Sequence, residues 1–299
     1  MWRRLAAVLT GLMLLPFFAA AEEYTENQWN FVDGEMDISA GIPADAEGVL
    51  ADIAASGKLR VGTDPYYPPQ EFIDPSLAGQ ERYVGADMEL ARLIAQRMGV
   101  ELEIVELDFS DILSNLGEGK CDLVISALAY LPSRASQATL SKGYFYTMNT
   151  SGTGMLIRTE DAELIVTVAD LSRRDIAAQR GSLQENQVAE YVQSYRQFMR
   201  LPDLQDVFDA VAEGTADAGA VDTEAAAAYI QNNPDCALTM ARGIRFTLDE
   251  QFDGDRVAAK KGETQLIYFV NGVISEVLEG GLYLQWYADA AAYAARLGL

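Results

Sequence analysis

A short apolar segment, LVIS at residues 123–126, constrains the fold of this chain more than any other stretch. The run does not alternate with polar residues, which is typical of a strand buried in a parallel sheet that helices cover on both faces. Small residues follow it, and then Pro132 and Arg134. Ligands of open α/β sheets bind just beyond the carboxyl ends of strands, so Arg134 is a candidate for holding a carboxylate. Taken alone, the stretch favours a solvated arginine that opens the next helix.

A second turn and strand of the same type occur in the other half of the chain. Residues 214–222 (GTADAGAVD) share with residues 119–126 (GKCDLVIS) a glycine, two further residues, an aspartate and then small and apolar residues. Gly-x-x-Asp turns are common in βαβ units, so one such echo is weak evidence. Its occurrence in equivalent positions of two halves indicates two α/β lobes that face each other.

Helices and strands are expected to alternate around both segments. Helical apolar spacing and glycine stops predict helices at 45–55, 87–98, 109–116, 184–198, 204–212, 224–231, 264–278 and 282–296. Short apolar runs predict strands at 58–62, 100–107, 121–126, 154–157, 176–178 and 217–221. Pro65, Pro68 and Pro69 exclude regular structure after the first strand and leave an extended loop at its carboxyl end. The order is that of doubly wound α/β lobes.

The first 21 residues read as a separate module. Arg3 and Arg4 precede an uncharged, mostly apolar run at 5–18, and an A-x-A motif ends at Ala21. This pattern predicts a secretory signal peptide that is cleaved after Ala21. The alternative of a membrane anchor is disfavoured because the run is shorter than the about 20 residues that a spanning helix needs. We therefore expect an exported, periplasmic protein.

Residues 22–56 are predicted to form an acidic N-terminal arm and a short helix. The stretch 22–48 has little periodicity, and glycines and a proline interrupt it. Trp29 and Phe31 are its candidate anchor points, and Asp45 is the expected N-cap of the helix, which ends at Gly57. The arm is therefore expected to wrap loosely around the rest of the chain.

Composition excludes several classes of function. The net charge of −23 disfavours nucleic acid and anionic membranes as partners. The chain has no histidine, which removes Ser-His-Asp and Cys-His catalysis and most transition-metal sites, so we expect neither a metal nor a cofactor. Cys121 and Cys236 form no disulfide framework, and we expect two unpaired thiols.

Several blocks of the sequence, in this order and spacing, are similar to a known family. The blocks are LRVGTDPYYPPQEF, YVGADMELARLIAQRMGVELEIVELDFSDILSNLGEGKCDLVISALAYLPSRA, IAAQRGSLQ, GTADAGAVD and KKGE…GGLYLQWY, and they span about residues 57–299. Together they resemble the periplasmic solute-binding proteins of the amino-acid (family 3) class, which supply ABC importers. The resemblance implies a two-lobed type II α/β fold with a hinge of two crossings and an interlobe cleft. Its expected parts are lobe 1 at 57–152 plus 256–299 and lobe 2 at 153–255.

The resemblance also implies roles for individual residues. Arg134 matches the arginine that pairs with the ligand's α-carboxylate, and Asp222 matches the acid that receives the α-ammonium group. Tyr67 matches the aromatic residue that covers the ligand, and Ser182 matches a hydroxyl of the second lobe. These roles agree with the need of a desolvated zwitterion for partners to both charges.

The sequence departs from the family's pattern around the expected carboxylate. Beside Ser126, which ends the first strand segment, the chain has Ala127 and Ala129 where many relatives have hydroxyls, and it has Leu183 where a threonine often follows Ser182. These changes make the pocket less polar, so a larger or more apolar ligand than an ordinary α-amino acid is an alternative. Asp64 and Glu71 are candidates for contact with a cationic ligand side chain, with loop capping beside the prolines as the equally weighted alternative.

The leading hypothesis is a monomeric, non-catalytic binding protein that delivers a small amine-bearing carboxylate to an ABC permease of the inner membrane. The first alternative is an exported dehydratase-type lyase on the same fold, which requires an acid to protonate a leaving group, such as Glu71 or Asp64. The second alternative is a ligand-responsive partner or sensor that uses the acidic arm for docking. A resemblance in fold does not separate these three.

Overall fold

The structure is a computed structural model that describes residues 31–146, 152–247 and 253–299. The expected signal peptide, its cleavage site after Ala21 and the candidate anchor Trp29 lie outside the described residues. So does the part of the expected second crossing at 250–252. Within the described ranges, no helix combines the length and the apolar character needed to cross a membrane.

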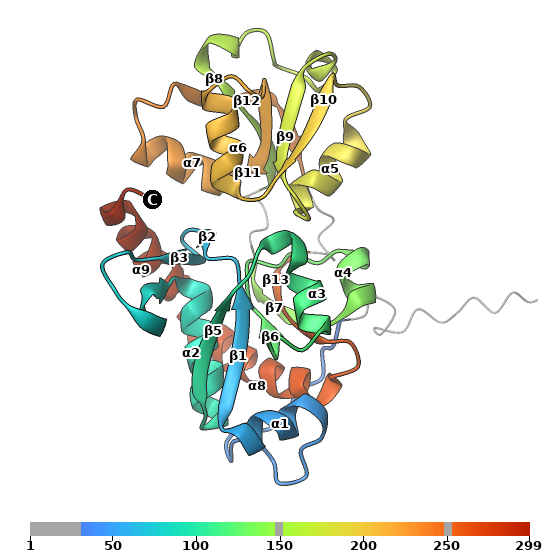
Figure 1. Ribbon diagram of the computed structural model, residues 1–299, viewed down its shortest axis with the longest axis vertical. Coiled ribbons are helices and arrows are strands. Elements are labelled where there is room, and N and C mark those ends of the chain that lie inside the picture. Colours follow the sequence, from blue (N-terminus) through green and yellow to red (C-terminus); the bar gives the residue numbers. More distant parts are fainter. Residues whose placement is uncertain (1–30, 147–151, 248–252) are drawn as a thin grey trace, which may run out of the picture.

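The chain folds into two α/β lobes, each built on a five-stranded sheet (Figure 1). The sheet of lobe 1 has the order β5-β1-β6-β13-β7. Its strands are β1 (Lys58–Thr63), β5 (Glu101–Glu106), β6 (Leu123–Val124), β7 (Ala138–Phe145) and β13 (Asp255–Lys260). A small sheet beside it consists of β2 (Tyr66–Tyr67), β3 (Glu71–Ile73) and β4 (Tyr83–Val84).

The sheet of lobe 2 has the order β10-β9-β11-β8-β12. Its strands are β8 (Thr153–Arg158), β9 (Asp175–Gln179), β10 (Gln197–Leu201), β11 (Ala218–Asp222) and β12 (Leu238–Phe246). In lobe 1, β1 pairs in parallel with β5 and β6, and in lobe 2, β9 pairs in parallel with β10 and β11, whereas β13 and β8 pair antiparallel with their neighbours. Both sheets are therefore mixed, and the buried segment 123–126 pairs in parallel with β1 on one side and antiparallel with β13 on the other.

Helices cover both faces of each sheet. Those of lobe 1 are α1 (Gly48–Ser56), α2 (Ala86–Met98), α3 (Ile112–Gly117), α4 (Pro132–Gln137), α8 (Thr264–Gly280) and α9 (Leu282–Leu297). Those of lobe 2 are α5 (Leu183–Tyr191), α6 (Leu204–Ala212) and α7 (Thr223–Asn232). Short 3₁₀ turns are η2 (Gly79–Arg82), η3 (Phe109–Asp111), η4 (Thr159–Asp161) and η5 (Val168–Leu171). Each lobe has buried apolar clusters on the two sides of its sheet.

Helix α2 illustrates how the sequence specifies these elements. The apolar residues that predict its stripe (88, 90, 91, 94, 95 and 98) are all buried against the sheet and α8. Gly99 ends the helix in a left-handed conformation (φ 72°), which glycine adopts at little cost. The helix therefore begins and ends within one residue of its predicted bounds.

Several local predictions differ from the structure; for example, the strand expected at 121–126 is limited to β6, and the helix expected at 109–116 begins with the turn η3. Helix α1 begins at Gly48, with Glu47 rather than Asp45 at the N-cap position. The helix expected at 184–198 ends at Tyr191, and strand β10 follows it. The proline-rich loop contains a short antiparallel pair, β2 with β3, because Tyr66 and Tyr67 lie between the prolines rather than at them. Strands β7, β12 and β13 were not predicted. The prediction of two unpaired cysteines is confirmed, with Cys121 buried and Cys236 half-buried.

Candidate functional site

A cavity of about 410 Å³ lies between the lobes. Both lobes contribute to its wall, lobe 1 through the ends of β1 and β6 and lobe 2 through β9, α5 and β11. All of the residues proposed from the sequence line it: Asp64, Tyr67, Glu71, Ser126, Ala127, Ala129, Arg134, Ser182, Leu183 and Asp222. The fold therefore brings the residues proposed from both halves of the chain together at one cavity. Their roles toward a ligand remain a proposal.

Arg134 lies in α4 and is 5% exposed. Its Nη1 donates to the carbonyl of Ala129 at 2.7 Å, and its Nη2 donates across the cleft to the carbonyl of Gly181 at 2.9 Å. Its guanidinium lies 5.3 Å from the ring centroid of Phe109. Burial lowers the pKa of Arg134 to about 10, and the charge of Asp255 partly opposes this shift. The solvated arginine favoured by the isolated stretch is thus excluded, and a fixed, desolvated cation stands at the cavity wall.

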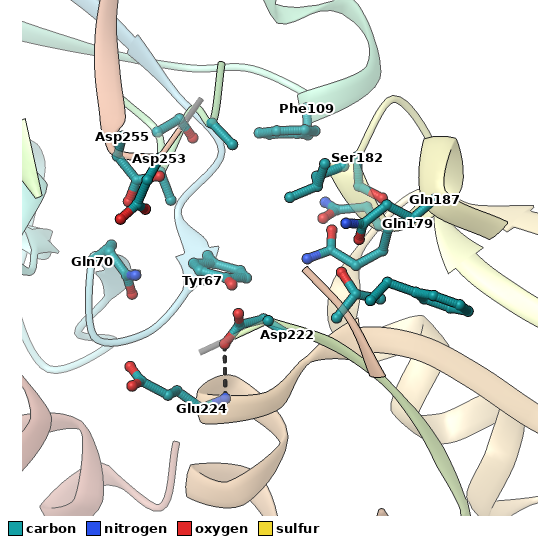
Figure 2. A pocket seen from close by; sticks show the side chains of 18 of the residues that line it. Tyr67, Gln70, Phe109, Gln179, Ser182, Gln187, Asp222, Glu224, Asp253 and Asp255 are labelled. Atoms are coloured by element: carbon teal, nitrogen blue, oxygen red, sulfur yellow. Dashed lines mark hydrogen bonds between the residues drawn. The ribbon is translucent and has the colours of Figure 1, made fainter. Parts of the chain in front are cut away.

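Asp222 ends β11 and caps α7 in lobe 2. Its Oδ1 accepts from the backbone N–H groups of Glu224 and Ala225 at 2.8 and 3.0 Å (Figure 2). An aspartate is a preferred N-cap because its carboxylate satisfies donors that the helix leaves unpaired. These bonds fix the carboxylate at the cavity wall, on the lobe opposite Arg134.

Tyr67 projects from lobe 1 into the space between the lobes. Figure 2 shows its ring between Asp253 and Asp255 on one side and Gln179, Ser182 and Gln187 on the other. The side chain also packs against the apolar cluster of lobe 2 that contains the helix α6. Burial and the charge of Asp222 raise the pKa of the Tyr67 hydroxyl well above its ordinary value. The ring is therefore neutral and offers a flat apolar surface to the cavity.

Ser126 forms hydrogen bonds with Glu71 and with the backbone of Asp64. Its hydroxyl donates to Glu71 Oε1 at 2.9 Å and accepts from the backbone N–H of Asp64 at 3.1 Å. Glu71 is 1% exposed, and burial together with the carboxylate of Asp87 raises its pKa well above the usual range. The same Asp87 accepts from the backbone N–H of Ala127 at 2.8 Å, which holds this non-glycine residue at a φ of 42°. Burial therefore favours the protonated form of Glu71, and the hydrogen bond from Ser126 fixes its carboxyl group within the core.

Asp64 links the two lobes directly. Gln179 Nε2, in lobe 2, donates to Asp64 Oδ2 at 3.0 Å. Asp64 is 4% exposed, and burial, followed by the charge of Asp203, raises its pKa to about 7. Near neutral pH this carboxyl exchanges a proton readily, so its charge depends on what the cavity holds.

The turn of lobe 2 that faces Arg134 supplies Ser182 and Leu183. Ser182 is the N-cap of α5, where its Oγ accepts from the N–H of Glu185 at 3.0 Å. Leu183, Ala127 and Ala129 give the wall beside Arg134 an apolar character. The departures noted in the sequence thus all fall on the lining, beside the buried guanidinium.

Sequence reasoning missed several lining residues. They are Phe109, Thr153, Gln179, Gln184, Gln187, Glu224, Arg245, Phe246, Asp253 and Asp255. Gln179 ends β9, so the rule that applies to Arg134 would have found it. Asp253 and Asp255 lie at the start of β13, a strand that was not predicted, so no signal pointed to them. Burial and the neighbouring charges of Asp87 and Asp222 raise the pKa of Asp255 well above its usual value.

The lining as a whole is acidic and rich in acceptors. Six carboxyl groups line the cavity, from Asp64, Glu71, Asp222, Glu224, Asp253 and Asp255, against the guanidinium groups of Arg134 and Arg245. Among the described residues, Gln70, Gln187 and Asp253 each carry a buried side-chain oxygen without a hydrogen-bond partner. Buried acceptors are costly to leave unpaired, so the cavity suits a guest that donates several hydrogen bonds. In the part of the chain that the structure describes, no acidic or cysteine cluster is placed to hold a metal ion.

Comparisons with known proteins agree with this arrangement. Residues 59–289 match the model of the bacterial extracellular solute-binding proteins, family 3. The arginine-binding extracellular protein ArtP of Bacillus subtilis is 30% identical over 181 residues, which are 60% of this chain and 66% of that protein.

Two solved structures are similar over most of the chain. One is an amino acid ABC transporter substrate-binding protein, AbpA of Streptococcus pneumoniae, bound to L-arginine (TM-score 0.72, 27% identity, 81% of this chain and 98% of that one). Another is the ancestral amino acid-binding protein AncCDT-1, a precursor of cyclohexadienyl dehydratase (TM-score 0.68, 26% identity, 81% and 99%). The family match, the two lobes and the interlobe cavity lead to one conclusion: this chain belongs to the bacterial extracellular solute-binding proteins of family 3.

Proposed function

We propose that this protein binds a small amine-bearing carboxylate with a cationic side chain between its lobes and delivers it to an ABC permease. The observation that carries the proposal is the pairing of a buried cation, Arg134 of lobe 1, with a fixed carboxylate, Asp222 of lobe 2, at one cavity. A zwitterion needs both charges compensated when it loses its water, and this pair supplies them from opposite lobes. Tyr67 covers the body of the ligand.

The excess of carboxyl groups over guanidinium groups in the cavity lining supports a ligand with a cationic side chain. After Arg134 and Asp222 are assigned to the two ends of the amino-acid group, the carboxyl groups of Asp64, Glu224, Asp253 and Asp255 remain against Arg245. Burial raises the pKa of Asp64 and Asp255, and a cationic guest would favour their ionised forms. The buried oxygens of Gln70, Gln187 and Asp253 add acceptors that a guanidinium or ammonium group would satisfy. The relatives that bind arginine agree with this charge.

The place of action follows from the family and from the N-terminal sequence. We propose a monomer in the periplasm, released from its signal peptide after Ala21, that presents the closed lobe pair to the permease. Support comes from the extracellular character of the family and from the A-x-A motif in the sequence.

The proposed function is non-catalytic. The lyase alternative has one observation in its favour: Asp64, with a pKa of about 7, is an acid able to transfer a proton near neutral pH. However, its carboxylate accepts from Gln179 across the cleft, an arrangement that serves lobe closure equally well. Incubation with arogenate-like substrates decides between them, because a lyase releases a dehydrated product and a binding protein returns the compound unchanged.

Calorimetric titration with three matched compounds tests the ligand class. L-Arginine carries the carboxylate, the amine and a cationic tail; L-citrulline keeps the shape but has a neutral tail; agmatine lacks the carboxylate. We expect L-arginine to bind at least about tenfold more tightly than either, since each lost charge leaves a buried partner unpaired. Equal affinity for L-citrulline would contradict the cationic tail, and equal affinity for agmatine would contradict the role of Arg134.

A further inference from the structure

The N-terminal arm, defined here as residues 31–38, lies outside the stretch of the chain that matches the family. It does not wrap loosely, as the sequence suggests, but runs along the outer edge of lobe 1 beside β7 and α8. The N–H of Val32 donates to the carbonyl of Leu140 at 2.8 Å, and Phe31 forms a parallel bridge with Leu140. The N–H of Met36 donates to the carbonyl of Tyr268 at 3.1 Å.

Side chains of lobe 1 fix the arm in place through hydrogen bonds, an ion pair and a close backbone contact. Asn271, which is fully buried, donates to the carbonyl of Gly34 at 2.8 Å and accepts from the N–H of Lys142 at 3.0 Å. Glu35 pairs with Lys142 Nζ at 2.6 Å. Gly272 lets the arm approach α8, because a Cβ there would lie 2.6 Å from the carbonyl oxygen of Met36. Such close contacts along the backbone indicate one defined docking geometry.

The first residue of the arm closes over a buried cation. The guanidinium of Arg256 lies 4.2 Å from the ring centroid of Phe31 and 5.6 Å from that of Tyr130, and the two rings meet edge to face at 6.0 Å. Arg256 is 4% exposed; its Nη1 donates to the carbonyl of Ser141 at 2.9 Å, and its Nε is buried without a partner among the described residues. Burial lowers the pKa of Arg256, and the nearby groups of Tyr146, Asp33, Tyr130 and Asp255 oppose this shift. The buried charge is costly, and the two ring faces help to stabilise it.

This enclosed cation lies directly behind the wall of the cavity. Asp255 lines the cavity, and the next residue, Arg256, contacts Phe31 of the arm; the register of β13 with β7 shifts between these two residues. On the neighbouring segment Ala129 lines the cavity and Tyr130 contacts Arg256. Ala129 forms a bridge with Asp255, its carbonyl accepts from Arg134, and the N–H of Arg256 donates to the carbonyl of Leu128 at 3.0 Å.

We propose that the N-terminal arm is a positioning element of the binding site, in which Phe31 seals Arg256 against Tyr130 and thereby holds the wall that carries Ala129 and Asp255. Without the ring, water reaches the guanidinium and the two segments of the wall lose their common support. The arm thus contributes to ligand affinity although none of its residues from 31 to 38 lines the cavity. The inference concerns the wall itself and holds for any ligand of the cleft.

Hydrogen exchange measured by mass spectrometry on the full chain, without ligand, tests the support of the wall. We expect Phe31→Ala to accelerate exchange of the Arg256 and Val257 amides by about threefold, the factor that loss of a cation–π contact of this kind predicts. Phe31→Tyr keeps the ring and should exchange like the wild type. Glu103→Gln is the control, because it removes an exposed ion pair with Lys58 on β5, at the edge of the lobe 1 sheet opposite the arm, and should leave both amides unchanged.

The same variants, titrated with L-arginine, test the effect on binding. Phe31→Ala should weaken affinity by about threefold, and Glu103→Gln should not change it; in an Arg256→Met background, Phe31→Ala should have no further effect. The proposal would be overturned by unchanged exchange in Phe31→Ala, by equal effects of Phe31→Ala and Glu103→Gln, or by an undiminished effect of Phe31→Ala beside Arg256→Met. A wild-type protein that does not bind L-arginine would contradict the proposed function instead, and the exchange result would still decide the role of the arm.

Discussion

Arg134 and Asp222 carry opposite charges at one cavity, but the protein holds them in different ways. Arg134 is enclosed and donates to two carbonyls, one of them in the opposite lobe. Asp222 is held by the N-terminus of α7. Removal of the Arg134 side chain should therefore disturb both ligand binding and the contact between the lobes. Neutralisation of Asp222 should leave the structure intact.

The first prediction concerns Arg134. Arg134→Ala removes a charge-assisted contact and leaves a ligand carboxylate desolvated, so binding should weaken by about 2–5 kcal/mol. Calorimetry with L-arginine measures the loss. Affinity within a factor of two of the wild type would show that the ligand carboxylate lies elsewhere.

The second prediction concerns Asp222. Asp222→Asn keeps the cap, because asparagine is an equally good N-cap, and removes only the charge. Binding of amine-bearing ligands should weaken by about 1.5–3 kcal/mol while the melting temperature stays constant. If affinity for the natural ligand does not change, that ligand is not an α-amino acid.

The third prediction concerns the pH dependence contributed by Asp64. Its pKa of about 7 in the folded protein exceeds the ordinary value of about 3.9, so the folded state binds the proton more tightly than the unfolded chain. The contribution of Asp64 is therefore most favourable below about pH 4 and is lost as the pH rises to about 7.

Asp64→Asn removes this dependence. Its free energy of unfolding should exceed that of the wild type at pH 8, by up to about 4 kcal/mol, and should fall less steeply between pH 4 and 7. Urea denaturation at several pH values makes the comparison. Identical slopes in the two proteins would refute the assignment of the raised pKa to Asp64.

At the scale of elements, the sequence predicts a helix or strand best where the pattern that specifies it lies within the element itself. Helices α2, α6, α8 and α9 follow from apolar stripes and from glycine or capping residues at their ends. Strand β10 has no such pattern, because it is a half-exposed edge strand whose apolar and polar residues do not alternate. The end of α5 at Tyr191 was missed because no glycine follows it. Strands β7, β12 and β13 pair with partners distant in sequence, which no local pattern encodes.

The candidate site divides in the same way. Residues at the ends of predicted strands, such as Arg134 and Asp222, were found from the sequence. Asp253 and Asp255 were not, because they reach the cavity only through the return of the chain to the sheet of lobe 1. The carbonyl contacts of Arg134 and the raised pKa of Glu71 depend on packing and could not be predicted.

The fourth prediction concerns the fit of α8 against the arm. Alanine is a better helix former than glycine by about 1 kcal/mol, yet Gly272→Ala should lower the free energy of unfolding by about 1–3 kcal/mol, because its Cβ would overlap the carbonyl of Met36. Gly117→Ala in α3 meets no atom within 4 Å and should be neutral or stabilising. Thermal denaturation compares them, and an equal response of both variants would contradict the close docking of the arm.

At the scale of the whole molecule, direct contacts join the lobes around the cavity. Arg134 bonds to Gly181, Gln179 to Asp64, and Tyr287 of α9 donates to Glu224 Oε2 of α7 at 3.2 Å. Figure 1 shows α9 reaching from lobe 1 toward α7. Closure therefore depends on contacts made by residues that line the cavity, since Arg134, Asp64, Gln179 and Glu224 all belong to its wall. The lobe limits at 57–152 plus 256–299 and 153–255 stay a prediction.

The fifth prediction concerns closure of the lobes in the absence of ligand. Tyr287→Phe removes one interlobe hydrogen bond of about 0.5–1.5 kcal/mol, so the open form should become more populated and affinity should fall by about twofold to tenfold. Small-angle scattering should give a larger radius of gyration for the unliganded variant than for the wild type. A smaller or unchanged radius would contradict a role of this bond in closure.

The central claim is that the cleft holds an amine-bearing carboxylate with a cationic side chain. Mass spectrometry of the small molecule released when the purified protein is denatured tests it most directly. We expect a compound that carries an amine, a carboxylate and a further basic group, in about equimolar amount with the protein. A neutral sugar, a dicarboxylate or any compound without an amine would contradict it.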